Sequence, residues 1–183
     1  GNNQVTLNGT AHTDKVTAGS GVNTFTIKGT GATYNLLDGG LGTQDSLIFD
    51  AATHTIAQAA KLQNFENVKL KNKSTVTINE ALILTDGGVG AGTVDIETGS
   101  EMAVKPTVAG DFEFDPLLTG KGLLSAVLDA NTSAFDFTTN VGNTFAGTVQ
   151  LGLSKFDLSA LNTASLTAAT LKTDTGNITT VGT

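Results

Sequence analysis

The sequence predicts an all-β protein, a parallel β-solenoid of about eight coils. Three observations predict it. Short segments place a polar residue between two apolar ones, which is the alternation of a strand with one buried face. These segments recur roughly every 20 to 30 residues, the spacing typical of a repeat protein. Gly, Asn or Asp follows many of them, so short strands with tight corners favour a β-solenoid over helical repeats.

The strand signals come in order along the chain. The expected coils start near Val5, Phe25, Leu47, Val68, Val94, Leu123, Val149 and Leu171. The first three steps are almost equal in length, and the fourth is slightly longer. Each coil would stack on the previous one, and Val, Ile, Leu and Phe would fill a narrow core. A β-sandwich is the alternative, because it also uses short strands and Gly-rich turns.

Two segments carry some helical spacing, "IAQAAKLQNF" at 56–65 and "GLLSAVLDA" at 122–130. We interpret both as corners or strands within coils. Another segment, 103–123, contains both prolines, Pro106 and Pro116, and lies in the long step that ends at Leu123. Since proline gives no hydrogen to a strand ladder, we expect a loop excursion there, on a candidate binding face. Residues 1–183 are expected to form a single solenoid domain, as a fragment of a longer protein.

Composition limits the function. The net charge is -7, which argues against a nucleic-acid-binding protein. Cysteine is absent, so neither disulfides nor thiolate metal sites are expected. No run of about 18 apolar residues occurs, so we expect no membrane insertion by this segment.

The stretch "DGGLGTQDSLIF" at 38–49 resembles part of a calcium-binding β-roll repeat. That repeat places an aspartate two residues after its third glycine and occurs in tandem. Here Gln44 is inserted, Asp45 comes one position late, and no second copy lies nine residues away. We therefore expect Gly39, Gly40 and Gly42 to turn a coil corner through positive φ angles. No cofactor is expected, and a metal site at Asp38 and Asp45 is the weaker alternative.

Four stretches resemble the passenger-domain repeats of type V autotransporters, surface proteins of Gram-negative bacteria. They are "NFENVKLKNKSTVTI" at 64–78, "TVDIETGSEMAV" at 93–104, "NTFAGTVQL" at 143–151 and "NTASLTAATLKTDTGNITTVGT" at 162–183. The resemblance implies a right-handed parallel β-helix outside the cell, attached through a translocator that this chain does not contain. It implies adhesion or self-association, with a host glycan, an extracellular-matrix component or another copy of the chain as partner.

No sequence motif indicates an enzyme. His12 and His54 lie in Thr-rich stretches and are expected to be isolated surface histidines. There is no G-x-S-x-G, no H-E-x-x-H and no P-loop. A carbohydrate-active β-helix enzyme stays open as an alternative, because stacking can bring distant carboxylates together.

Two charge patterns are candidates for binding. Lys69, Lys71 and Lys73 alternate with other residues, so a strand would put all three on its outer face. Such a stripe would suit acidic glycans or anionic polymers, although a solvated outer face is the simpler interpretation. The acidic pattern is densest in "DFEFDP" at 111–116, with Asp111, Glu113 and Asp115. It too is either a solvated face or a polar contact for self-association.

Overall fold

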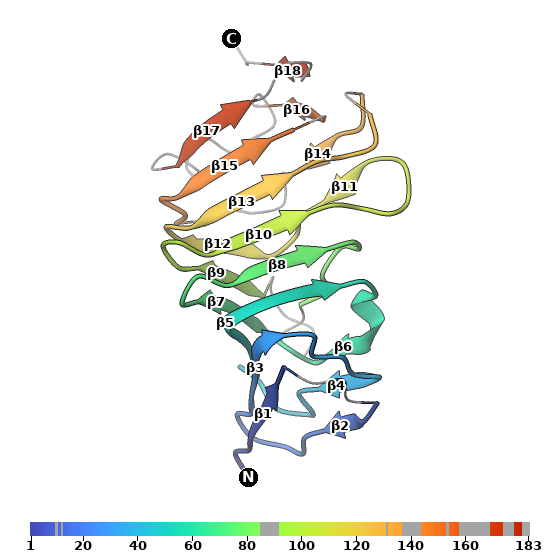
Figure 1. Cartoon of the computed structure of the whole chain (residues 1–183), viewed down its shortest axis with the longest axis vertical. Helices are drawn as coiled ribbons and strands as arrows, with labels where there is room; N and C mark the ends of the chain where they lie inside the picture. Colours follow the sequence, from blue (N-terminus) through green and yellow to red (C-terminus); the bar gives the residue numbers. More distant parts are fainter. Residues whose placement is uncertain are drawn as a thin grey trace.

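The computed structural model describes residues 1–9, 11, 13–84, 92–130, 132–136, 144–152, 154–157, 169–173 and 178–180. In this part of the chain every paired strand is parallel to its neighbours, and the strands stack along the long axis of the molecule (Figure 1). The N-terminal strand lies at one end of the stack and the last two strands lie at the other. The predicted parallel β-solenoid is therefore confirmed, with about six turns.

Two long strand ladders form one sheet of eleven strands, joined through β5, which belongs to both. The first ladder contains β1 (Gln4–Asn8), β3 (Thr24–Thr30), β5 (Ser46–Ile56), β7 (Asn67–Lys71), β9 (Thr93–Ile96) and β12 (Leu117–Gly120). The second ladder starts with the end of β5 and continues with β8 (Thr75–Ile78), β10 (Glu101–Val104), β13 (Leu123–Ala126), β15 (Thr148–Leu151) and β17 (Thr170–Thr173).

Shorter strands complete the coils on the remaining side. They are β2 (Lys15–Thr17), β4 (Leu36–Asp38) and β6 (Leu62–Gln63) in one sheet, β11 (Phe112–Glu113) with β14 (Phe135–Asp136), and β16 (Lys155–Asp157) with β18 (Ile178–Thr180). A single turn of 3₁₀ helix, η1 (Ala59–Lys61), precedes β6. The segments 56–65 and 122–130 therefore form strand ends, corners and this short turn, as predicted. No helix in the described residues has the length and apolar character needed to span a membrane.

The core fills the inside of the coils. Apolar side chains at alternate strand positions point inward and stack on equivalent residues one coil away, as Phe25, Leu47, Val68 and Val94 do. All four are at most 1% exposed. Phe25 and Phe65 also meet edge to face, with ring centroids 5.2 Å apart. This burial is the main stabilising contribution, since removing apolar surface from water is favourable.

Two columns of buried polar residues fix the register between coils. In the first, the backbone N–H of Asn23 donates to Asp45 Oδ1, and that of Asp45 donates to Glu66 Oε2, each at 2.5 Å. In the second, the N–H of Ala52 donates to Ser74 Oγ at 3.0 Å, and that of Ser74 donates to Ser100 Oγ at 3.1 Å. Each bond joins a coil to the next and satisfies a backbone donor that would otherwise be buried without a partner.

The predicted series of coil starts is right up to Val94 and wrong after it. In the first ladder Val94 pairs with Leu118, so the next coil of that ladder starts in β12. The predicted start Leu123 instead opens β13 of the second ladder, where Leu124 pairs with Val149 and Val149 with Leu171. Strands of both ladders carry the same alternation, so the predicted series moved from one ladder to the other. In the described part of the chain each ladder contains six strands, which corresponds to about six turns rather than the predicted eight.

The segment 103–123 contains short strands separated by connections. It holds the end of β10, all of β11 and β12, and the start of β13. Residues 105–111 leave the strands, and Figure 1 shows this connection projecting from the stack. Val108 on it is 76% exposed. The long step predicted from Val94 to Leu123 does not exist, because it joined strands of different ladders.

A pair of leucine substitutions tests this packing. Leu47 is 0% exposed in the core, whereas Leu41 is 90% exposed at a corner. Leu47→Ala should lower the free energy of unfolding by about 2–5 kcal/mol, since it leaves a cavity. Leu41→Ala should change it by less than about 0.5 kcal/mol. Chemical denaturation followed by circular dichroism measures both, and equal effects would contradict the described core.

Candidate functional site

The glycine-rich stretch 38–45 forms a coil corner, but its glycines act mainly through close packing. Of its three glycines only Gly40 has a positive φ angle, 102°, so the predicted positive φ at Gly39 and Gly42 is wrong, whereas Gln44 has a φ of 74°. A Cβ atom on Gly39 would collide with the carbonyl oxygen of Asn64. A Cβ atom on Gly42 would collide with the carbonyl oxygen of Gly21. Successive corners therefore stack so closely that a side chain has no room.

The two aspartates of this corner serve the backbone and its neighbours. Asp38 Oδ1 accepts the N–H of Gly40 at 2.9 Å and the side-chain amide of Asn64 at 2.7 Å. Asp45 is fully buried, and its Oδ1 also accepts the amide of Asn23 at 3.1 Å. In the part of the chain that the structure describes, no three His, Cys, Asp or Glu side chains form a group that could hold a metal ion. A calcium-free corner stays a prediction.

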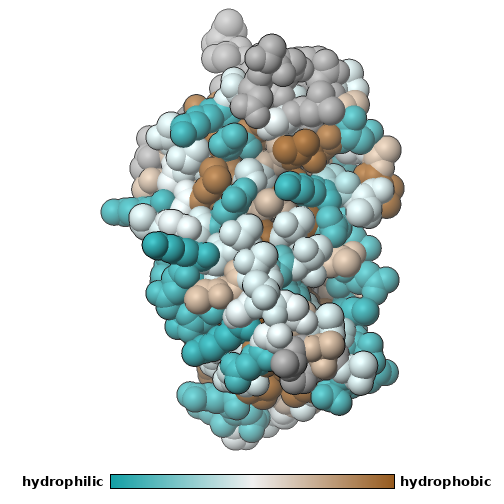
Figure 2. All heavy atoms as spheres, in the orientation of Figure 1, coloured by the Kyte–Doolittle hydropathy of each residue, from teal (hydrophilic) through white to brown (hydrophobic). Residues whose placement is uncertain are grey.

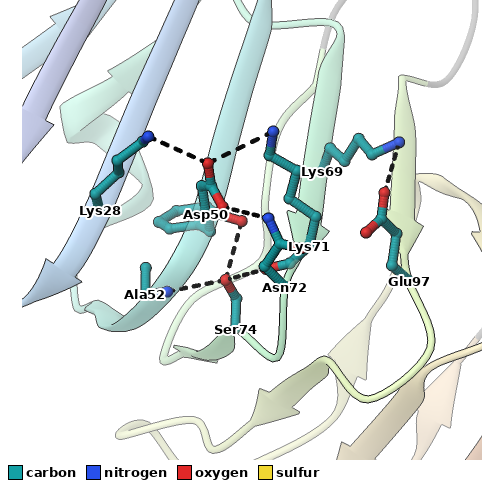
Figure 3. Close-up of polar contacts among 9 residues, drawn as sticks. Lys28, Asp50, Ala52, Lys69, Lys71, Asn72, Ser74 and Glu97 are labelled. Atoms are coloured by element: carbon teal, nitrogen blue, oxygen red, sulfur yellow. Dashed lines mark hydrogen bonds and ion pairs between the residues drawn. The ribbon is translucent and has the colours of Figure 1, made fainter.

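The lysine stripe is tied into a network of opposite charges across four coils (Figure 3). Lys71 and Lys28 both lie beside Asp50, with Nζ to Oδ2 distances of 3.5 and 3.4 Å. The Lys69 ammonium lies 3.0 Å from Glu97 and 3.2 Å from Asp95. Three carboxylates thus offset the charge of three lysines, and little positive charge is left for an anionic polymer.

Two pKa values reflect this network. A hydrogen bond from Asn72, together with the charges of Lys71 and Lys28, lowers the pKa of the Asp50 carboxyl. The hydrogen bond to Glu97, reinforced by Asp95, raises the pKa of the Lys69 ammonium. Both shifts favour the charged forms, so the network is ionised at neutral pH. Its members are partly exposed, so each pair is worth roughly 1 kcal/mol or less.

Lys73 does not continue the stripe. Strand β7 ends at Lys71, and Asn72 and Lys73 follow with φ angles of 55° and 62°. They form the corner between the two long ladders, where Gly99 of the next coil also has a positive φ, 84°. The sequence pattern extends the strand alternation two residues too far, because the corner begins at Asn72. Lys73 is exposed and apart from the network.

The acidic candidates lie together on one short strand and its flanks. Asp111, Glu113 and Asp115 are exposed and alternate with the buried rings of Phe112 and Phe114. Asp111 Oδ1 accepts the N–H of Ala134 at 2.7 Å.

Glu113 stands in a negative environment. Its neighbour on β14 is Asp136. The charge of Asp115 and a hydrogen bond with it, then Asp136, raise the pKa of Glu113. The arrangement is a negative patch on the surface, with no group in it that could hold a metal among the described residues.

His54 is buried, and the expectation of a surface histidine is wrong for it. It lies at an inward position of β5 and is 8% exposed. Its Nε2 is 3.2 Å from the hydroxyl of Tyr34 one coil away, and its ring lies against those of Tyr34 and Phe49. Burial lowers the pKa of His54 from 6.5 to about 4 and raises that of the Tyr34 phenol. His12, the other histidine, lies outside the described residues.

A half-open hollow of about 170 Å³ lies above this His–Tyr pair. It is lined by residues 32–34 of one coil and by His54, Thr55, Ala57, Gln58 and Lys61 of the next. We call it the His54 pocket. The short helical turn η1, which ends at Lys61, lies directly before β6 at the margin of the stack (Figure 1). None of these lining residues was predicted as a binding residue.

One signal for the pocket is present in the sequence. His54 follows the alternation of "SLIFDAATHTI", which places it on the same inward face as Ala52 and Ile56. The pairing of His54 with Tyr34 needs the coil register, because 20 residues separate them. Lys61 reaches the pocket only because η1 turns the chain there.

Comparison with known proteins gives one informative similarity. A stretch of 142 residues, 75% of this chain, is 32% identical to the uncharacterized lipoprotein YdeK of Escherichia coli strain K12. The match covers 10% of that protein, so the chain spans about a tenth of its length. No protein family matches the chain. No solved structure matches it either. The chain is thus a β-solenoid protein distantly similar to an uncharacterized lipoprotein.

A glycine pair tests the close packing at the corner. Gly42→Ala should lower the free energy of unfolding by about 1–3 kcal/mol, since the new methyl group forces the corners of two coils apart. Gly19→Ala is the control, because its Cβ would meet nothing within 4 Å. It should leave stability unchanged or slightly raised. Thermal unfolding compares the two, and equal stability of both variants would contradict the packing.

The buried histidine predicts a pH dependence. In the unfolded chain His54 binds a proton below its ordinary pKa of 6.5, whereas in the fold it does so only near 4. The contribution of His54 to the free energy of unfolding is therefore fully present above pH 6.5. It decreases by about 3 kcal/mol as the pH falls from 6.5 toward 4.

A His54→Phe variant isolates this contribution. It keeps a ring beside Tyr34 and Phe49 but cannot titrate, so its stability should fall less between pH 6.5 and 4 than that of the parent chain. The carboxylates titrate in both proteins and cancel in the difference. Parallel curves for the parent and His54→Phe would show that His54 is not buried in its neutral form.

Proposed function

We propose that this chain acts in a bacterial cell-surface passenger that mediates adhesion or self-association without catalysing a reaction. The proposal starts from the fold. A parallel β-solenoid with a filled core presents its side chains only on the outside, along an elongated stack (Figure 1). Such a surface can make many weak contacts in series, and linked weak contacts add up to strong attachment.

The similarity to a lipoprotein supports a location at the cell envelope. A lipoprotein is held to a membrane by its lipid, and YdeK carries that description. Attachment of this kind would place a solenoid where it can meet other cells, a glycan or a matrix component. The resemblance of several repeats to autotransporter passengers supports the same location, and the partners remain a host glycan, an extracellular-matrix component or another copy of the chain.

The surface itself supports weak, polar contacts. Figure 2 shows one face of the molecule with hydrophilic side chains along its length and hydrophobic ones in small separate groups. The most exposed large apolar residues of the described part, Leu41, Val108 and Ile83, lie at corners or outside strands. A large hydrophobic patch would favour one tight interface, whereas dispersed polar groups favour multivalent and salt-sensitive binding.

The test is a bead assay with the purified chain. Beads coated with the chain should cluster with one another, or bind immobilised glycans or matrix proteins, and should do so less as salt rises from low to physiological levels. Beads coated with heat-unfolded chain are the control. Absence of clustering and of binding at low salt would contradict the proposed function.

Two variants then locate the contact on the solenoid. One replaces Lys69, Lys71 and Lys73 by alanine, and the other shortens the exposed connection 105–111. Because Lys69 and Lys71 are already paired with carboxylates, we expect the lysine variant to change adhesion less than the loop variant. Release of reducing sugars from any polysaccharide that binds would contradict the non-enzymatic part of the proposal.

A further inference from the structure

The His54 pocket combines a positive charge with hydrogen-bonding groups and has no acidic wall. None of its lining residues is a carboxylate, and Lys61 is the charged side chain among them. Within the described residues Lys61 forms no ion pair, unlike Lys28, Lys69 and Lys71. Glu80 reaches this corner from the next coil, where its carboxylate accepts the N–H of Ala59 at 2.8 Å and stays outside the lining of the pocket. The pocket can therefore receive a negative charge.

Another hollow on the surface shows the contrast. It lies beside Lys121 and is lined also by Asp95 and Glu97. These two carboxylates, which also pair with Lys69, would compete with an anion for Lys121 there. The two lysines thus stand in different surroundings, and only the His54 pocket, of these two hollows, offers a cation without a competing carboxylate in its lining.

The size and lining of the His54 pocket limit the ligand further. About 170 Å³ is less than the roughly 300–1,000 Å³ of pockets that enclose drug-sized ligands. The space suits one small unit rather than a whole chain. Thr55 and Gln58 supply a hydroxyl and an amide, while Ala32 and Ala57 supply small apolar walls. A sugar ring carries both hydroxyl groups and C–H faces, which match this mixture.

The polar atoms on the floor of the pocket bond to each other rather than to a ligand. The Tyr34 hydroxyl and His54 Nε2 satisfy one another at 3.2 Å, and both residues are at most 9% exposed. The rings are nearly parallel, with an interplanar angle of 22°. They hold the floor in place between two coils, so recognition falls to the groups at the rim, Thr55, Gln58 and Lys61.

We propose that the His54 pocket binds a single acidic sugar residue whose carboxylate pairs with Lys61. The inference rests on the proposed function, because it names the glycan that a surface adhesin of this kind would hold. One pocket of this size binds weakly by itself. Attachment would come from many chains on one surface meeting many acidic residues of one polysaccharide.

Titration of the purified chain with trigalacturonate, a trisaccharide with three carboxylates, tests the proposal. Neutral maltotriose is the comparison, and NMR shifts of the His54 and Tyr34 ring protons report where the ligand binds. Trigalacturonate should bind and maltotriose should not. Lys61→Gln should weaken binding about fivefold, as expected for one partly exposed charge contact. Ala57→Leu should abolish binding, because the larger side chain fills the pocket.

Lys15→Gln is the matched control, since Lys15 is exposed, forms no ion pair in the described part of the chain and lies outside both the pocket and the connection 105–111. It removes the same charge and should leave binding unchanged. Thermal unfolding checks that all three variants are folded. Equal binding of trigalacturonate and maltotriose, or equal losses in Lys61→Gln and Lys15→Gln, would overturn the proposal. Equally tight binding of a sulfated disaccharide would overturn the assignment to a carboxylate.

The bead assay separates this inference from the proposed function. If the beads cluster or bind a matrix component but the chain does not bind trigalacturonate, the pocket assignment is wrong and the proposed adhesive function is supported. Binding of trigalacturonate by the chain, without any attachment of coated beads, would support the pocket and contradict adhesion. The two readouts are independent because one measures a monomer in solution and the other a dense surface.

Discussion

The backbone hydrogen bonds between successive coils are the constraint on which the rest of this structure depends. Parallel strands stack about 4.8 Å apart only if their corners approach equally closely. At Gly42 the chain runs so near Gly21 that a Cβ atom has no space, and at Asp45 a buried carboxylate oxygen accepts the backbone N–H of Asn23. Corners and inner polar columns thus keep the spacing that the ladders require, and the apolar core fills what remains.

This constraint does not fix which residues lie on the outer face. In this chain the outer residues of successive coils carry charges that offset one another. Residues one coil apart lie side by side, so like charges in register would repel. The chain instead places Lys28, Asp50 and Lys71 in successive coils, with the signs alternating along the stack. A stripe that looks basic along one strand is therefore nearly neutral across strands. Recognition of an anion then needs a lysine outside this network, and Lys61 satisfies that condition.

The fold was predictable because a solenoid repeats its constraint, and the site was not because it occurs once. Alternation and spacing placed Phe25, Leu47 and Val68 correctly in one ladder. The same signal could not tell that ladder from the second, whose strands carry the same alternation, so Leu123 was assigned to the wrong one. Lys73 was placed on a strand because nothing in its residue type marks the positive φ of the corner. The pocket forms because the coil register brings Tyr34 next to His54 and because the turn η1 brings Lys61 to the rim. A local sequence pattern predicts neither of these.

The buried pair of Tyr34 and His54 shows how a repeating fold can support a local specialisation. At equivalent positions of the second ladder the residues that follow His54 are Val76, Met102 and Leu124, all apolar and buried. His54 occupies this position in place of an apolar residue. Burial lowers the pKa of its imidazole to about 4, so the side chain is neutral at neutral pH. The pair satisfies its own polar atoms across two coils and needs no change in their spacing. The hollow above the pair therefore lies on two buried rings, while Gln58 and Lys61 of its polar rim come from a corner that the stacking leaves free to vary.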